Sequence, residues 1–387
     1  MIDIKKKSRC TGCSACYNIC PYNCIEMVAD REGFQYPIIN KSQCRQCGLC
    51  EKVCPELHTE KEEHNNSKFY VGNSISPENV ANSSSGGAFV ELAKKVLHKS
   101  GIVYGAAFND DFVLNHISIG TEEELYKLQK SKYIQSNIND TYRKIKQNLC
   151  DGKIVLFCGT PCQVSGLKKY IGNKADNLIL VDFICHGVPS QEAFKKYIRC
   201  IREEINEASK IVSVDFRIKT YGWESYGIKI EFESGNVYEK KGNEDYWIKA
   251  FLQDIMLRPS CYECINKGMT RESDITIADA WGIKQYNEKL YNEKGTSLVI
   301  VHTKKGLALC NGISGDFFAE EVSEDFIKKY NMHAYYPAIL DYRRKKFFKK
   351  LQESNDYKIS VDESIDINTF VRIQRKIKKE RMFRNGK

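Results

Sequence analysis

The sequence predicts two parts of different fold class: a small, cysteine-rich α+β module at the N-terminus, and a larger α/β region with a β-rich insertion. Eight of the 17 cysteines fall in two matching runs between Cys10 and Cys54. From about residue 69, short apolar runs typical of buried strands alternate with amphipathic helical patterns. From residue 211, several strand-like runs follow one another without a helix between them. A chain of 387 residues is long enough for two or three such domains.

Both cysteine runs read C-x2-C-x2-C-x3-C-P, and the second, which begins at Cys44, repeats the first, which begins at Cys10. This repetition indicates an internal duplication. In this spacing, three thiolates of one run converge on a cuboidal iron–sulfur cluster and the fourth cysteine reaches the other cluster. We therefore expect two 4Fe-4S clusters. Their ligands are Cys10, Cys13, Cys16 and Cys54 for the first, and Cys20, Cys44, Cys47 and Cys50 for the second.

The alternatives for these eight cysteines are zinc and a disulfide framework. Zinc prefers isolated cysteine pairs, which a doubled run of four does not provide. The pattern instead resembles two-cluster bacterial ferredoxins, over about a seventh of the chain. Cys24 is interpreted as a small residue packed beside a cluster.

Composition favours a cytoplasmic protein. Iron–sulfur ligation requires reduced thiols, which a reducing cytoplasm provides. Met1 to Arg9 is lysine-rich with no apolar run after it, and no stretch approaches the length of a membrane-spanning apolar helix, so we expect neither a signal peptide nor a transmembrane segment. The net charge of +9 is modest, and lysines are not interleaved with aromatic residues, so a nucleic-acid partner is not expected.

The chain divides into five segments. These are the dicluster module at 1–57, a polar linker at 58–68, the first and second parts of the larger region at 69–150 and 151–340, and a basic helical tail at 341–387. The tail is a candidate contact for nucleic acid or an anionic membrane, with packing on a partner subunit as the alternative.

In the larger region, the expected helices lie around Phe89–Leu97, Glu122, Thr141–Leu149, Cys162–Leu167 and from Glu192, and one capped by Asn243 ends before Pro259. The expected strands are Ile102–Phe108, Phe112–Ile119, Lys153–Phe157, Leu178–Ile184, Ile275–Ala278 and, as the last, Thr296–His302. Alternation of strands and helices predicts a mainly parallel sheet. Val212–Ile218, Tyr226–Phe232 and Asn236–Tyr238 are typical of a meander.

Four further cysteines occur on three loops of the larger region. Cys162 follows Gly-Thr-Pro at a strand-to-helix turn, Cys185 ends a buried strand, and Cys261 and Cys264 form a C-x2-C pair. Four thiolates are the ligand set of a third 4Fe-4S cluster or of one zinc ion. Alternatively, Cys162 is a nucleophile, because a helix N-terminus lowers the pKa of a thiol.

A serine- and glycine-rich loop and an aromatic loop are candidate cofactor contacts. Ser83 to Gly87, including Ser84, Ser85 and Gly86, precede a helix and offer N–H groups suited to the pyrophosphate of a dinucleotide flavin, with simple N-capping as the alternative. Asp279, Trp281 and Gly282 follow a strand, where an edge loop can face a ring system. His186 is a candidate proton relay to a reduced flavin, or a core histidine satisfied by hydrogen bonds.

Six stretches, in order, resemble the beta subunit family of coenzyme F420 (deazaflavin) hydrogenases and dehydrogenases. They are Ser83–Gly87, Ser131-Lys132-Tyr133, Gly159–Gln163, Cys185–Ser190, Cys261-x2-Cys264 and Ser273–Gly282. The match spans roughly residues 69–340, and the chain looks most like ferredoxin-fused bacterial members. The resemblance implies an α/β domain that binds FAD and its own 4Fe-4S cluster, with Lys132 among the cofactor contacts.

These observations predict an iron–sulfur flavoprotein oxidoreductase that moves electrons between one-electron clusters and a two-electron carrier or substrate. Flavins exchange electrons singly or in pairs, which suits them to that junction. We expect ferredoxin or another redox protein as partner, and a small molecule or the deazaflavin as substrate. The alternative is a non-catalytic electron-transfer subunit that lacks flavin and docks on a partner enzyme.

Overall fold

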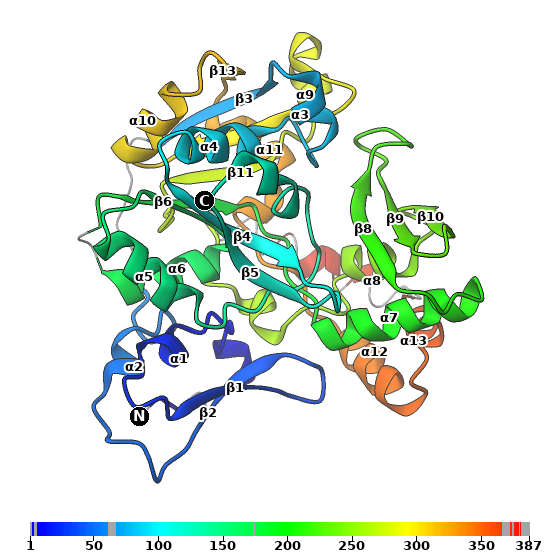
Figure 1. Cartoon of the computed structure of the whole chain (residues 1–387). Coiled ribbons are helices and arrows are strands. Elements are labelled where there is room, and N and C mark those ends of the chain that lie inside the picture. Colours follow the sequence, from blue (N-terminus) through cyan, green and yellow to red (C-terminus); the bar gives the residue numbers. More distant parts are fainter. Residues whose placement is uncertain are drawn as a thin grey trace.

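The computed structural model describes residues 2–3, 6–60, 67–172, 175–365, 372–373, 375–378 and 380. Part of the expected linker, residues 61–66, and part of the helix expected between Arg372 and Arg384 lie outside the described residues. Figure 1 shows a small N-terminal module below a large domain with a central sheet, and a second sheet at the side. Among the described residues, no helix combines the length and the apolar content that crossing a membrane requires.

The N-terminal module contains little regular structure. Its elements are η1 (Lys7–Arg9), α1 (Ala15–Ile19), β1 (Ile25–Ala29), β2 (Gln35–Ile39) and α2 (Leu49–Lys52). β1 and β2 pair antiparallel, with Ile25 opposite Ile39. Ser14 before α1 and Gly48 before α2 both adopt the left-handed conformation, at φ 61° and 77°. Each directly follows the second cysteine of its run, so the duplication in the sequence recurs in the backbone.

The central sheet has eight strands in the order β13-β3-β12-β11-β7-β6-β4-β5. Their bounds are β3 (Lys68–Ser74), β4 (Ile102–Phe108), β5 (Leu114–Ile119), β6 (Val155–Cys158), β7 (Leu178–Phe183), β11 (Ile275–Asp279), β12 (Ser297–Val301) and β13 (Phe317–Glu321). Only β4, β6, β7 and β11 pair in parallel. The expectation of a mainly parallel sheet is wrong, because antiparallel strands flank this parallel centre on both sides.

Helices cover both faces of the central sheet. α4 (Ala88–Leu97) and α10 (Lys304–Asn311) pack on one face, where Leu156 and Val181 point. α5 (Thr141–Cys150) and α6 (Pro161–Ile171) pack on the other face, against Phe157 and Leu180. Neighbouring strand residues point to opposite faces, which explains the continuous apolar runs. The α5–α6 layer also carries the N-terminal module, which lies directly beneath it in Figure 1.

The β-rich insertion is a separate meander of β8 (Ile211–Ile218), β9 (Gly227–Phe232) and β10 (Val237–Lys241). It shares a core, which includes Trp247, Tyr197 and Tyr357, with four helices. These are α7 (Gln191–Glu204), α8 (Tyr246–Leu252), α12 (Tyr342–Glu353) and α13 (Tyr357–Ile365). The segment expected as a basic tail therefore begins inside the domain, because α12 and α13 bury apolar residues in this core.

Three local expectations need correction. Asp245, and not Asn243, caps α8, because its carboxylate accepts the Ile248 N–H. The helix expected at Glu122 is a 3-10 helix, η2 (Glu122–Lys127). The sheet gains a final strand, β13, whose burial falls on Phe317 alone and gives little periodic signal. The remaining elements are α3 (Pro77–Ala81), η3 (Pro259–Glu263), α9 (Ile283–Tyr286), η4 (Glu288–Leu290), α11 (Glu324–Tyr330) and η5 (Met332–Ala334).

Candidate functional site

The eight cysteines of the N-terminal module line two separate small cavities. One is bounded by Cys10, Cys13, Cys16 and Cys54. The other is bounded by Cys20, Cys44, Cys47 and Cys50, with Cys24 in the same wall. Each cavity thus takes three cysteines from one run and the fourth from the other run. This is the crossed arrangement that the spacing predicts for two cubane clusters.

The two cavities differ in exposure. All four cysteines of the first cavity are buried, whereas Cys47 is exposed and Cys44 and Cys50 are half-buried. Burial raises the pKa of Cys13 and of Cys16, and neighbouring thiols raise both further. Cys13 packs in one core with residues of α5 and α6, so the first cavity lies against the large domain, whereas the second reaches the surface.

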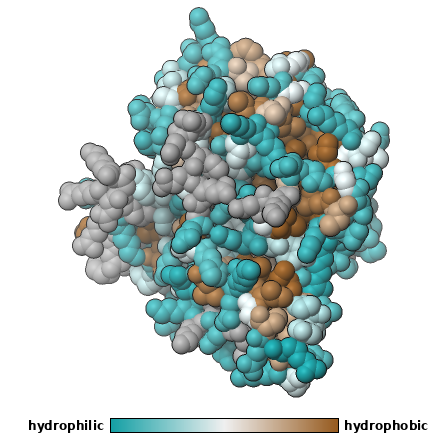
Figure 2. All heavy atoms as spheres, turned by 90° about the vertical axis from the view of Figure 1, so that its left-hand side faces the viewer, coloured by the Kyte–Doolittle hydropathy of each residue, from teal (hydrophilic) through white to brown (hydrophobic). Residues whose placement is uncertain are grey.

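The module also exposes apolar side chains. Figure 2 shows brown patches at the lower end of the molecule, the level at which Figure 1 places the module. Its large apolar residues with exposed side chains are Tyr22, Val28, Ile38, Leu49 and Leu57. Tyr22 and Leu49 also line the second cavity, so apolar surface adjoins the exposed cysteine site.

Cys24 lies against the second cavity without belonging to either run. Its Sγ is 3.4 Å from the Sγ of Cys20, and its side chain is buried. Burial raises its pKa to about 12, and the neighbouring Cys20 and Cys44 thiols contribute to that rise. This placement matches the interpretation of a small residue packed beside the site.

In the large domain, the sequence Gly-Thr-Pro-Cys-Gln begins α6 for clear local reasons. The Thr160 hydroxyl accepts the Gln163 N–H, and the Gln163 side chain in turn accepts the Thr160 N–H, which forms a capping box. Pro161 occupies the first helical turn, where its missing N–H costs no hydrogen bond. Cys162 is thereby fixed at the helix start, with its Sγ 3.1 Å from the Thr160 hydroxyl.

The loop after β7 and the loop of η3 are held together by backbone contacts. Pro189 forms an isolated bridge with Leu257, and the Arg258 N–H donates to the Val188 carbonyl at 2.9 Å. A Cβ on Gly187 would lie 2.7 Å from the Leu257 side chain and 3.3 Å from Cys261 Cβ, so only glycine permits this approach. These contacts bring the Cys185 loop beside the Cys261 loop.

The four cysteines of the large domain are neighbours in the structure. Burial, with a smaller contribution from thiols of the same set, raises the pKa of Cys162, Cys185 and Cys261 to about 12. A nucleophilic thiol needs a lowered pKa, so the interpretation of Cys162 as a nucleophile is not supported by its environment. Among the described residues, no three His, Cys, Asp or Glu side chains are grouped closely enough to hold a single metal ion.

A cavity of about 570 Å³ lies beside this group, which is within the usual range for small-molecule sites. Cys185 and His186 line one part of its wall. The predicted cofactor contacts Ser84, Ser85, Gly87, Lys132, Asp279 and Trp281 also line it. The fold therefore gathers residues from both halves of the large domain around one space.

Two predicted contacts, Gly86 and Gly282, do not line the cavity. A Cβ on Gly86 would lie 2.6 Å from the Gly72 carbonyl oxygen, and a Cβ on Gly282 would lie 2.0 Å from the Tyr330 ring. The Gly86 N–H donates to the Ser297 hydroxyl at 2.9 Å. Both glycines therefore serve close packing. The Ser85 hydroxyl likewise donates to a backbone carbonyl, that of Thr296, at 2.8 Å.

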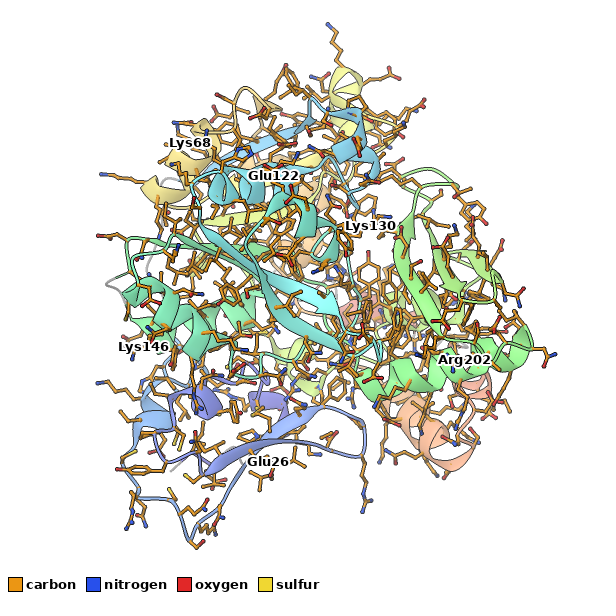
Figure 3. All side chains as sticks on the ribbon, viewed as in Figure 1. Glu26, Lys68, Glu122, Lys130, Lys146 and Arg202 are labelled. Atoms are coloured by element: carbon orange, nitrogen blue, oxygen red, sulfur yellow. The ribbon has the colours of Figure 1, made fainter. Side chains whose placement is uncertain are left out.

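Positive charge gathers at the serine-loop side of the cavity. Burial lowers the pKa of Lys132 to about 8, and Lys132 Nζ donates to the Gln129 carbonyl at 2.6 Å. Burial also lowers the pKa of Lys219 to about 8, and its Nζ donates to the Ser85 carbonyl at 3.1 Å. Lys130, labelled in Figure 3, pairs with Asp215 of β8 at 2.5 Å. This wall suits an anionic group.

Sequence reasoning missed Arg217, which holds the aromatic side of the cavity. It is buried and pairs with Asp279, with Nη1 3.0 Å from Oδ2. Its guanidinium lies 4.1 Å from the Tyr226 ring centroid and 5.2 Å from that of Trp281. Trp281 stacks on Trp223 at 5.2 Å. Arg217 lies in the meander, and no local motif links an arginine of β8 to an aspartate at the end of β11.

His186 is anchored by the carboxylate of Asp254, a residue that the sequence analysis did not single out. Its Nε2 lies 2.7 Å from Asp254 Oδ1, and its ring lies 4.1 Å from that of His333. Asp254 also pairs with Arg375 at 2.7 Å, which ties the C-terminal segment to this site. Hydrogen bonding and charge from His186 and Arg375 overcome burial and lower the pKa of Asp254. His186 is thus held in one orientation beside the cavity.

Family models match two separate segments of the chain. Residues 9–57 match the family model of the 4Fe-4S dicluster domain, and residues 152–325 match the family model for the C terminus of the coenzyme F420 hydrogenase/dehydrogenase beta subunit. No curated protein matches the sequence. Among solved structures, the chain is similar to one in the F420-reducing nickel–iron hydrogenase complex from Methanosarcina barkeri. That similarity has 16% identity and a TM-score of 0.46, over 79% of this chain and 94% of that one. The chain therefore joins a segment that matches the 4Fe-4S dicluster domain, residues 9–57, to a segment that matches the C terminus of the coenzyme F420 hydrogenase/dehydrogenase beta subunit, residues 152–325.

Proposed function

We propose that this protein is an iron–sulfur flavoprotein oxidoreductase, in which the dicluster domain exchanges electrons with FAD in the 570 Å³ cavity. One observation carries the proposal: Cys185 belongs both to the four-cysteine group and to the cavity wall. A cluster held by that cysteine would adjoin the cavity ligand directly. We propose Cys162, Cys185, Cys261 and Cys264 as the ligands of a third 4Fe-4S cluster.

The residues present suit both a third 4Fe-4S cluster and FAD. Four thiols from three loops can each ligate one iron, and cubane clusters are held by four cysteines. In the cavity, Lys132 and the start of α4 would bind the pyrophosphate, while Trp281 and Tyr226 would contact the ring system. A bound flavin supplies the exchange between paired and single electrons.

We propose that His186 donates a proton at the cavity wall. Its Nε2 is engaged by Asp254, so the ring has a fixed orientation and its other edge remains for the cavity. Asp254 acts through His186 and is a positioning residue. The substrate is a small two-electron carrier, for which the deazaflavin is one candidate.

At the other end of the path, we propose that a redox protein docks on the dicluster domain. The exposed Cys47 and the neighbouring apolar side chains of Tyr22 and Leu49 support this site. An apolar patch next to an exposed redox centre allows close approach of a partner. A reduced ferredoxin or flavodoxin is the kind of donor expected.

The test is anaerobic reconstitution of the full chain with iron, sulfide and FAD, followed by visible spectroscopy and iron analysis. The proposal expects a flavin band that bleaches on reduction and about twelve irons per chain, four for each cluster. Reconstituted protein with about eight irons would contradict the third cluster. A protein that carries iron and passes electrons, yet binds no flavin, would instead be the non-catalytic electron-transfer subunit.

A further inference from the structure

One fully buried arginine lies between the dicluster domain and the four-cysteine group. Arg258 precedes η3, which carries Cys261, and 1% of its surface is exposed. Its Nε donates to the Cys10 carbonyl at 2.8 Å, and its Nη2 lies 3.8 Å from Cys10 Sγ. It therefore spans from the loop of one cysteine set to the loop of another.

The other contacts of Arg258 fix its guanidinium against the first cysteine loop and β2 of the dicluster domain. Its Nη2 donates to the Gln35 carbonyl at 2.8 Å, and its Nη1 donates to Gln135 Oε1 at 3.0 Å. Gln135 in turn donates to the Thr11 carbonyl at 2.9 Å. A Cβ on Gly12 would lie 2.8 Å from Arg258 Nη1, and Gly12 has a φ of 68°. Glycine is required here because the guanidinium lies directly against the loop.

The charge of Arg258 lacks a carboxylate partner in the part of the chain that the structure describes. Its hydrogen-bond acceptors are carbonyl and amide oxygens and a cysteine sulfur, and its guanidinium lies 4.4 Å from the Tyr36 ring centroid. A buried charge is costly unless an opposite charge compensates it. A cluster bound by the thiolate of Cys10 would supply the compensating negative charge.

Arg258 also adjoins the four-cysteine group. It lies directly before η3, which carries Cys261, and its backbone N–H donates at 2.9 Å to the carbonyl of Val188, in the loop that follows Cys185. The Cys261 N–H donates to the Arg258 carbonyl at 2.9 Å, so the two residues share one turn. Arg258 is therefore near both cysteine sets, whereas the Cys44–Cys50 run is absent from its contacts.

We propose that Arg258 is the positioning residue of the junction between the dicluster domain and the four-cysteine group, where it raises the reduction potential of both adjoining clusters. This rests on the proposed function for the third cluster only. A fixed positive charge and an N–H donor near sulfur favour the reduced, more negative state of a cluster. The buried cation thus makes the inner cluster of the module a better acceptor than it would otherwise be.

Arg344 provides a matched control. It is also a buried arginine that joins the two domains, since its guanidinium pairs with Glu32 and its Nε donates to the Leu257 carbonyl at 2.8 Å. It differs in having a carboxylate partner and no cysteine among its contacts. Replacing it disturbs the interface without removing charge from the junction.

The experiment is a redox titration of anaerobically reconstituted full-length protein, monitored by electron paramagnetic resonance, for wild type, Arg258→Gln, Arg258→Lys and Arg344→Gln. In R258Q we expect more negative midpoints for the Cys10 cluster and the third cluster, and no shift for the Cys44–Cys50 cluster. R258K keeps the charge and should shift less, and R344Q should leave all midpoints unchanged.

Unchanged midpoints in iron-replete R258Q would overturn the proposal, and so would equal shifts in R258Q and R344Q. If R258Q does not retain iron, a second charge-removing variant, Arg258→Met, decides: midpoints more negative than those of R258K support the proposal, and equal midpoints in the two variants contradict it. Iron analysis of the wild type separates the two proposals. With about eight irons the third cluster fails, yet the shift of the Cys10 cluster remains measurable.

Discussion

Both domains of this chain bring several cysteines close together, but they do so in different ways. In the N-terminal domain, all eight ligand candidates lie between Cys10 and Cys54, and fixed local spacing brings them together. In the large domain, four cysteines spread from Cys162 to Cys264 meet only because β6, β7 and η3 are adjacent in the fold. The first arrangement depends on loop geometry, and the second depends on the whole central sheet.

The difference should be largest when iron is removed. Among its described residues, the N-terminal domain has one two-stranded sheet, two α-helices of five and four residues and one short 3-10 helix, and its core consists largely of cysteines. A single hairpin is marginally stable by itself, and metal-binding energy is then folding energy. We expect anaerobic chelation to unfold this domain completely while the large domain keeps its structure.

Hydrogen exchange followed by mass spectrometry measures this directly. Peptides from residues 6–57 should lose all protection in the chelated protein, whereas peptides covering β4, β6 and β7 should keep theirs. Retained protection in β1 and β2 would show that the N-terminal domain folds without iron. The two domains would then not differ in their dependence on metal.

A cysteine substitution sharpens the same comparison. Cys264→Ser should remove about four of twelve irons, because one cluster is lost, and should leave the fold intact since the sheet does not depend on that loop. Cys150→Ser is the control, because Cys150 is exposed at the end of α5 and belongs to neither cysteine set. Iron analysis and circular dichroism report both outcomes. Equal iron in the two variants would contradict the third cluster.

The parts that sequence reasoning predicted correctly are those written in local patterns. The spacing predicts that Cys20 lies with the second cysteine run and Cys54 with the first, and the two cavities group them in this way. The Thr-Pro-Cys-Gln sequence likewise predicts the start of α6. The sheet was predicted as mainly parallel because β3, β12 and β13 carry no local sign of their direction. Gly86 and Gly282 resemble cofactor loops in sequence but serve packing against Gly72 and Tyr330, which only the fold reveals.

The residues that were missed share one property, which is that their partners are remote. Arg217 depends on Asp279, Asp254 on His186, and Arg258 on the Cys10 loop. Each pair joins separate elements, so spacing along the chain gives no signal. Unpaired basic residues in apolar strands or beside a proline are the feature that could have drawn attention to Arg217 and Arg258.

Removing the ion pair between Arg217 and Asp279 should lower the stability of the large domain and disturb the cavity. Asp279→Asn leaves a buried guanidinium without its charge partner, which costs roughly 3–5 kcal/mol. We expect a lower urea midpoint for the large domain, measured by tryptophan fluorescence, and loss of flavin binding. The exposed pair of Glu124 and Lys127 is the control, because solvent screens this pair and Glu124→Gln should change the urea midpoint little. A similar small loss in D279N would show that the pair is solvated.

The smallest expected effect concerns the pH dependence of cavity binding. Burial lowers the pKa of Lys132 to about 8, so this lysine is mostly charged at pH 7 and mostly neutral at pH 9. If it binds the anionic part of the ligand, affinity falls as pH rises through that range, by at most roughly tenfold. Fluorescence titration with FAD at pH 7 and pH 9 measures the change. Lys132→Arg keeps its charge throughout and should abolish the pH dependence, and Lys132→Met should bind weakly at both pH values. A wild-type affinity that does not change, or that rises toward pH 9, would mean that the anion lies elsewhere along the wall, nearer Lys130 or Arg217.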